Sequence, residues 1–553
     1  MNPFIHPLQR VLVALVAILV AFGSAQADSS KPEQRRFAQN AATAPGQTLY
    51  LEARHAEIVV SGSDENEIAL EATVELSSGN AEARDAFFAA TQLLLEPRGQ
   101  DFRAVLKIPE WEEESEDKRE SSGFLRRLFH RVEHREQARI VLRVDVPSRY
   151  GLDIASEFGD VHIEGIEGAI RIDNRSGRIS VENSGGSFDA RSHYADLEVV
   201  SFAGDIHYRG ASSAVSLRDI TGNATVHTTY DPVSAVGVSG TLHIDAQSSR
   251  IEGRDIGADC TISTSYNPVV VDNVAGNLSV SARSSKVKVA DIKGNAHIES
   301  SYNPIAVNRV AGNLEIRGSS SSVAVERVEQ DVYVRTSYNP ITVGHVAGNL
   351  EIDGSSCSVI VRQISGDTKV VNSYNPVTAE DIAGNLVIRG SSSPVTVERI
   401  EQNATIRTSY NPIVAEEIGG DLRIDGNSCS VLVEGIEGDA TIANSHNYVV
   451  VKGSAGALSI NGHNSPIEVS SVAALPATGR VELFTTGKPI ELHIPADADI
   501  EARLQTNRGK IRSDFPLLTE EDGRNRKNAR LELGSAGTQV HVRTDGDIRI
   551  EKQ

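Results

Sequence analysis

A tyrosine recurs every 36 residues through the middle of this 553-residue sequence, in most cases within the string Ser-Tyr-Asn-Pro. The spacing never changes, and Phe158 and His446 extend the series by one step at either end. A repeat of constant length over this many units indicates a solenoid or a similar array rather than a string of separate domains. The series consists of Tyr194, Tyr230, Tyr266, Tyr302, Tyr338, Tyr374 and Tyr410.

Each 36-residue repeat divides into blocks of nine. Pairs of apolar residues two positions apart recur in every block, which is the spacing of a strand with one buried face. Gly, Asn, Ser and Pro lie between the pairs and supply turns and positive-φ positions. Each block is therefore predicted to be a short strand followed by a turn. Successive pairs include Ile305 with Val307, Leu314 with Ile316, and Val323 with Val325.

A second apolar series, in the turns, sets the length of one coil. It recurs every 18 residues, so that one corner of the coil carries an aliphatic side chain and the other is rich in serine. We therefore predict an all-β fold: a parallel β-solenoid with 18-residue coils and β-rich caps at both ends, right-handed because parallel crossovers almost always are. An antiparallel array of hairpins and a propeller are the alternatives, and the cross-section is either flattened or three-sided. The series is Ile220, Val238, Ile256, Val274, Ile292, Val310, Val328, Val346, Ile364, Ile382, Ile400, Ile418 and Ile436.

The repeat occupies only part of the chain. We predict a signal peptide over residues 1–27, a flexible linker over 28–47, an N-terminal β-rich cap over 48–155, the solenoid over 156–475 and a C-terminal β cap over 476–553. Caps are expected because the ends of a solenoid expose strand edges and apolar core.

Within the N-terminal cap, residues 56–60 and 138–144 alternate as strands do, and residues 82–90 are a candidate short helix. A charged insertion is acidic at 110–114 and basic at 124–129, with apolar residues on one helical face. Two interpretations stay open for it: a helix that docks on an anionic membrane surface or partner, or a charged helix packed on the cap.

The N-terminus has the three parts of a secretory signal peptide: Arg10, an apolar run over 11–22, and small residues ending at Ala27. The run is shorter than the roughly 20 residues that a membrane-spanning helix needs, so cleavage is favoured over a retained anchor. No later stretch is apolar enough to span a membrane as a helix. We expect an exported chain that is periplasmic, secreted or at the cell surface.

The charge of the chain bears on nucleic-acid binding, and the positions of its cysteines bear on disulfide formation. The formal net charge of -21 excludes a protein that binds nucleic acid through bulk positive charge. Cys357 and Cys429 occupy equivalent serine-rich corners four coils apart, which is too far for a disulfide. Cys260 lies in the inward strand column and is expected to be a small core residue.

The seven tyrosines are the candidate ligand-binding residues. Exposed aromatic rings in a regular row can stack against sugar rings. In the alternative interpretation, each ring packs beneath the Asn-Pro turn that follows it, and the asparagines form an amide ladder. Those asparagines are Asn267, Asn303, Asn339, Asn375 and Asn411.

No catalytic, cofactor-binding or metal-binding residues are predicted. The segment from His130 to His134 formally matches an inverted zinc-protease motif, but the flanking arginines repel a dication. The outward column Arg317, Asp353, Arg389 and Asp425 alternates in sign at two-coil spacing, which suits a solvated surface better than a catalytic carboxylate pair.

Strand blocks such as 159–163 and 177–181, the lead-in at Val146-Pro147 and the closing segment 540–550 resemble a bacterial putative-adhesin family of unknown function, itself related in pattern to autotransporter-adhesin head domains. The resemblance covers nearly all of the chain after the signal peptide. The resemblance implies a β-solenoid of cell-envelope or surface character. The family has no catalytic residues that could be assigned to positions of this chain.

The function expected from the sequence is that of an exported, non-enzymatic, adhesin-like solenoid. It presents a repetitive surface to a polysaccharide or other glycan, a cell-envelope component or a protein. The alternatives are a carbohydrate-active β-helix enzyme, which would turn over a polysaccharide, and a structural spacer, which would bind no ligand.

Overall fold

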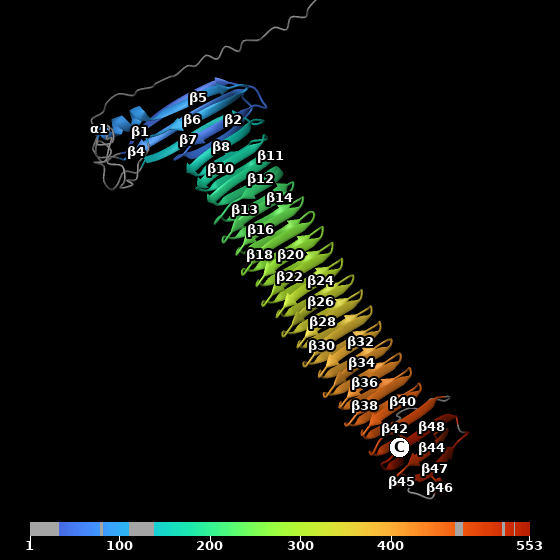
Figure 1. Cartoon of the computed structure of the whole chain (residues 1–553). Coiled ribbons are helices and arrows are strands. Elements are labelled where there is room, and N and C mark those ends of the chain that lie inside the picture. The colour runs from blue at the N-terminus through green and yellow to red at the C-terminus, as the bar shows by residue number, and fades with distance from the viewer. Residues whose placement is uncertain (1–31, 78–80, 110–137, 471–478, 523–525, 536) are drawn as a thin grey trace, which may run out of the picture. The chain divides into compact units, whose positions relative to one another are not determined.

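The computed structural model describes residues 32–77, 81–109, 138–470, 479–522, 526–535 and 537–553 (Figure 1). The chain divides into two compact units, residues 1–267 and 268–553, which are described separately. The predicted signal peptide, the charged insertion and the segment from His130 to His134 lie outside the described residues. Among the residues that are described, no helix has the length and apolar character needed to cross a membrane.

The strands of the repeat follow the nine-residue blocks. From β14 (Ala224–Thr229) to β40 (Leu458–His463), every strand has six residues and begins nine residues after the one before it. This regularity arises because most blocks have two inward-facing apolar residues and a turn of small or polar residues. The spacing predicted from the apolar pairs is confirmed.

In the second unit, each strand pairs in parallel with the next strand but one. Val287 of β21 (Val287–Ile292) lies beside Ile305 of β23 (Ile305–Val310), and Ala296 of β22 (Ala296–Ser301) beside Leu314 of β24 (Leu314–Ser319). The register shift is 18 residues, so one coil contributes one strand to each of two parallel sheets. We call these the odd sheet (odd-numbered strands β19 to β41) and the even sheet (even-numbered strands β20 to β40).

The predicted parallel β-solenoid with 18-residue coils is confirmed, and its cross-section is flattened, because each described coil contributes two strands and thus builds two sheets. The first unit has the same pairing, with β13 (Val215–Thr221) beside β15 (Val233–Val238) and β14 beside β16 (Leu242–Gln247). The core between the sheets is thin and consists mainly of Val, Ile and Leu side chains that are almost fully buried.

The turn from an odd to an even strand forms the aliphatic corner. Val310, Val346 and Ile382 lie there with at most 1% of their surface exposed, as the 18-residue series predicted. A ladder of Asn and Asp side chains follows the corner. The backbone N–H of Asn313 donates to Oδ1 of Asn295 at 2.8 Å, and later coils repeat this bond. The ladder stabilises the stacking of neighbouring coils, and we did not anticipate it from the sequence.

The turn from an even to an odd strand forms the polar corner, where small polar side chains point inward. Thr336, only 4% exposed, donates from Oγ1 to the carbonyl of Ser321 at 2.9 Å and accepts the N–H of the same residue at 3.2 Å. Such bonds satisfy backbone groups that would otherwise be buried without partners. Further pairs of this kind are Ser393 with Thr408, Cys357 with Asn372, and Cys429 with Asn444.

The first unit begins with two sheets, and α1 (Ala81–Ala90), the helix that the sequence predicted, lies at one end of their strands (Figure 1). The predicted strands at 56–60 and 138–144 are also present. The linker prediction is wrong for residues 33–42, which form β1 and pair antiparallel with β4. The strands of this region are β1 (Glu33–Ala42), β2 (Thr48–Ala53), β3 (Glu57–Ser63), β4 (Glu67–Leu76), β5 (Gln92–Arg98), β6 (Asp101–Lys107), β7 (Ala138–Pro147), β8 (Gly151–Phe158), β9 (Val161–Glu164), β10 (Ile170–Ser176), β11 (Ile179–Tyr194) and β12 (Leu197–Arg209).

The second unit ends in strands that depart from the regular stacking. β44 lies between β47, with which it is antiparallel, and β48, with which it is parallel. This change of direction stops the addition of further parallel coils to that sheet. The strands are β42 (Arg480–Thr485), β43 (Ile490–Ile494), β44 (Ile500–Thr506), β45 (Ile511–Ser513), β46 (Leu518–Asp522), β47 (Arg526–Leu533), β48 (Thr538–Thr544) and β49 (Ile548–Lys552).

The three cysteines are buried free thiols. Burial raises the pKa of Cys260, on β18 (Cys260–Ser265), from 9.0 to about 12. Because the folded state favours the protonated thiol, this contribution to stability is intact below pH 9 and is lost as the pH rises from 9 toward 12. We expect the free energy of urea unfolding to fall more steeply over this range in the native protein than in Cys260→Ala. Equal slopes would contradict the burial of this thiol.

Candidate functional site: the tyrosine edge

The seven tyrosines lie at the polar corner, each in a turn that leads from one strand to the next. In the second unit, Tyr302 lies between β22 and β23, and Tyr338, Tyr374 and Tyr410 occupy the equivalent turns, two coils apart. In the first unit, the equivalent residues include Tyr230 and Tyr266. We use the name tyrosine edge for the polar-corner turns of the second unit between residues 300 and 466. Two coils correspond to a spacing of about 9.6 Å.

The tyrosines of this edge are exposed. Between 68% and 71% of the surface of Tyr302, Tyr338, Tyr374 and Tyr410 is accessible. The interpretation in which each ring packs beneath the following Asn-Pro turn is therefore wrong. The rings are free to contact a partner.

One backbone conformation presents every ring in the same way. The φ angles of the four tyrosines lie between 63° and 65°, in the left-handed region. The serines at the same position of the alternate coils, Ser320, Ser356 and Ser392, have φ angles of 55° to 58°. Tyrosine and serine thus alternate along one column of left-handed residues.

The strain of this conformation leads to a prediction at Tyr338. A left-handed residue with a Cβ costs about 1 kcal/mol or more, and a β-branched residue costs most. Tyr338→Gly relieves that cost and adds flexibility to the unfolded chain, so we expect a stability within about 0.5 kcal/mol of the native value. Tyr338→Val should lose about 1–2 kcal/mol. Urea unfolding of the two variants measures the difference in stability. Equal stabilities would show that the left-handed conformation at position 338 does not penalise a β-branched residue.

The asparagine after each tyrosine holds the turn in place. Nδ2 of Asn339 donates to the carbonyl of Ser320 at 2.7 Å, and Asn375 bonds Ser356 in the same way. The predicted amide ladder between asparagines is wrong, because each amide bonds the left-handed serine of the preceding coil instead. The bond fixes the turn from which the ring projects. The same bond is made by Asn267, Asn303, Asn411 and Asn447.

The tyrosine edge, from residue 300 to residue 466, carries no Lys, Arg, Asp or Glu, whereas the polar-corner turn before it, 282–286, carries Arg283 and Lys286. Charged residues make up 23% of the chain, yet Lys, Arg, Asp and Glu are absent from every turn of this edge. The opposite, aliphatic corner carries Arg309, Arg327, Asp381 and Arg399. The sequence displays this asymmetry, but the 36-residue spacing of the tyrosines does not reveal it. The turns are 300–304, 318–322, 336–340, 354–358, 372–376, 390–394, 408–412, 426–430, 444–448 and 462–466.

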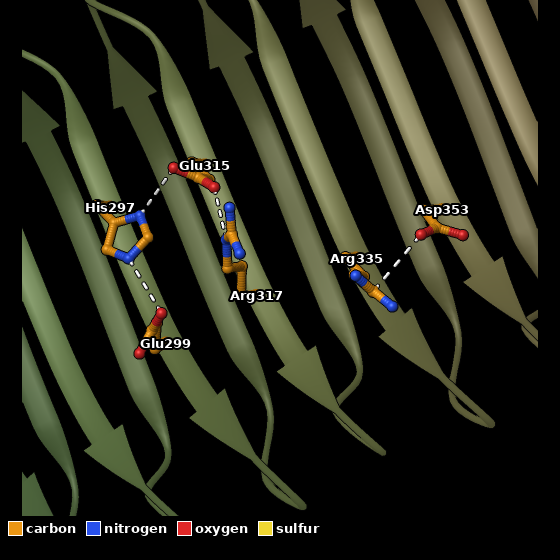
Figure 2. A network of polar contacts seen from close by, with 6 residues as sticks. All are labelled: His297, Glu299, Glu315, Arg317, Arg335 and Asp353. Carbon is orange, nitrogen blue, oxygen red and sulfur yellow. Dashed lines mark hydrogen bonds and ion pairs between the residues drawn. The ribbon is translucent and has the colours of Figure 1, made fainter.

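The outer face of the even sheet is charged, and several of its charges are paired. Figure 2 shows His297 between two carboxylates, with Nδ1 3.0 Å from Glu315 and Nε2 3.3 Å from Glu299. Nε of Arg317 donates to the same Glu315 at 2.6 Å. The bonds to Arg317 and His297 lower the pKa of the Glu315 carboxyl.

The column in which Arg317, Asp353, Arg389 and Asp425 alternate in sign belongs to this face. Arg335 lies 3.5 Å from Asp353 (Figure 2), and Arg407 lies 3.5 Å from Asp425. The two aspartates of the column are thus paired with arginines of the preceding coil, whereas Arg317 pairs with Glu315 on its own strand. A glycosidase acid needs a raised pKa so that it is protonated at neutral pH, whereas the pKa of Glu315 is lowered. Within the described residues, no group of three or more His, Cys, Asp or Glu side chains is placed to hold a metal ion.

Comparisons with known proteins give two structural neighbours. A putative cell adhesion protein from Clostridium sporogenes is 7% identical, covers 95% of this chain and 100% of its own length, and superposes with a TM-score of 0.14. A putative adhesin from Parabacteroides distasonis is 10% identical, covers 72% of this chain and 99% of its own length, and has a TM-score of 0.15. No family model and no curated protein matches the chain.

Proposed function

We propose that this protein is an exported, non-enzymatic, adhesin-like solenoid that uses its tyrosine edge to bind a glycan of a cell envelope or surface. One observation carries the proposal: aromatic rings in one conformation stand exposed at equal intervals along an uncharged edge. A tyrosine presents a large apolar face with a polar tip, which suits contact with a sugar ring. Export rests on the signal-peptide pattern of residues 1–27.

Repetition supports binding over catalysis. A row of equivalent rings gains affinity through many weak contacts along one ligand, because each contact after the first is intramolecular. A catalytic site instead requires one unique arrangement of groups. The paired charges on the even sheet favour a solvated surface, and a protein or another envelope component remains the second class of partner.

The test is a glycan array probed with the native chain and with a triple variant, Tyr302→Ala, Tyr338→Ala and Tyr374→Ala. We expect the native chain to be retained on a subset of glycans and the triple variant to lose that retention. Tyr333→Ala is the matched control, because this tyrosine lies on the even sheet and outside the edge. Retention by the triple variant would remove the tyrosine edge from the proposal. Turnover of a polysaccharide would favour the enzyme, and no retention in any assay would favour a spacer.

A further inference from the structure

We infer that the ligand of the tyrosine edge is an uncharged, extended polysaccharide of the β-1,4-linked type, lying along the edge with every second sugar against one tyrosine. This inference rests on the proposed function and names the class of glycan. Three observations carry it: the lack of charge on the edge, the step between tyrosines, and the residue that alternates with them.

The lack of charge selects a neutral ligand. An interface for a charged partner places complementary charges against it, and the turns from 300 to 466 hold none. The chain as a whole carries a net charge of -21, so its field repels a polyanion. Hydroxyl, amide and aromatic groups make up the edge, and they match the hydroxyls and the apolar C–H faces of neutral sugars.

The step between tyrosines selects the ligand's repeat. Consecutive tyrosines of the edge are two coils apart, or about 9.6 Å. In an extended β-1,4-linked chain, successive sugars are flipped, so that the same ring face returns at every second sugar, and each sugar advances by close to one strand spacing. An extended peptide repeats after two residues, or about 6.8 Å, and falls out of step with the rings. A coiled α-1,4-linked glucan does not run straight along the edge.

Serine at the alternate positions leaves room for the intervening sugar. Ser320 lies one coil from both Tyr302 and Tyr338, in the same left-handed conformation, and Ser356 lies between Tyr338 and Tyr374. A small side chain between two rings allows a straight chain to stay in contact with both. The alternation of large and small residues thus corresponds to the alternation of ring faces along such a glycan.

Isothermal titration calorimetry of the full chain tests the inference. The probes are cello-oligosaccharides and chito-oligosaccharides from the disaccharide to the hexasaccharide, with maltohexaose and an oligogalacturonate as controls. We expect affinity for at least one β-1,4-linked series to rise with each added disaccharide, because each one reaches a further tyrosine. Maltohexaose and the anionic oligogalacturonate should bind at least tenfold more weakly.

The variants Tyr338→Ser and Tyr374→Ser give the second measurement. Serine is the matched replacement because it already occupies this conformation at Ser320 and Ser356, and circular dichroism with a thermal midpoint verifies the fold. Each variant should lower the affinity for the hexasaccharide by about two- to tenfold. The control Tyr333→Ser should leave it unchanged.

The outcomes separate this inference from the proposed function. Tighter binding of oligogalacturonate or maltohexaose, lost in the tyrosine variants, would overturn the inference and leave the proposed function standing. Binding of β-1,4-linked probes that no edge substitution affects would overturn both. The absence of binding to every neutral probe would also overturn the inference.

Discussion

Asn372→Leu is expected to lower the free energy of unfolding by about 3 kcal/mol, because it removes the hydrogen-bond partner of several buried backbone groups. The Asn372 side chain is 3% exposed and lies at the polar corner. Its Oδ1 accepts the N–H of Cys357 at 3.1 Å, and its Nδ2 donates to the carbonyls of Cys357 at 2.7 Å and Asn375 at 3.1 Å. Leucine has a similar volume but satisfies none of these groups.

The matched control is Asn372→Thr. Threonine occupies the equivalent position at Thr336 and Thr408, where its hydroxyl bonds the residue that corresponds to Cys357. We expect the threonine variant to keep most of the stability that leucine loses, as measured by urea unfolding followed by circular dichroism. A leucine variant as stable as the threonine variant would show that the polar corner is held by shape alone.

Ile382→Ala should cost about 3 kcal/mol, because Ile382 is fully buried at the aliphatic corner and its truncation leaves a cavity between stacked coils. Its neighbours in the column, Ile364 and Ile400, lie directly beside it on the adjacent coils. Close packing along the column limits how far the site can collapse.

Val387→Ala is the control for this prediction. Val387 lies on β32 (Leu386–Ser391), only five residues further along the chain, but its side chain is partly exposed on the outer face of the even sheet. We expect a loss below about 0.5 kcal/mol on urea unfolding. Similar losses for the two variants would contradict the assignment of the 18-residue series to the interior.

The core of the solenoid was predictable because its positions repeat. Leu314 and Ile316 alternate with outward-facing residues within one strand, and the aliphatic position of Val310 recurs in every coil. Periodicity alone therefore identifies which side chains point inward. β1 was not predictable in this way. Its sequence is polar, and its strand conformation depends on antiparallel pairing with β4, a partner that lies elsewhere in the chain.

The candidate site was predicted in position but not in geometry. The 36-residue spacing located Tyr302 and its equivalents, whereas exposure of the rings depends on the sign of φ and on the partner of Asn303. Neither follows from spacing, because a left-handed tyrosine is unusual and the bond of Asn303 reaches a serine one coil away. In the sequence, the uncharged edge and the Asn/Asp ladder are columns of residues at 18-residue spacing. The stacking of the coils shows that the first surrounds the exposed tyrosines and that the second bonds neighbouring coils.

The most direct test of the account is fluorine NMR of the full chain labelled with 3-fluorotyrosine, titrated with cellohexaose and with chitohexaose. Single Tyr→Ser variants assign the signals. We predict that the signals of the exposed tyrosines on the edge, such as Tyr338 and Tyr374, shift on addition of at least one glycan, while those of the buried Tyr150 and Tyr208 stay in place. Shifts confined to Tyr333 on the even sheet, or unchanged edge signals at saturating glycan, would contradict the claim that the tyrosine edge is the binding surface.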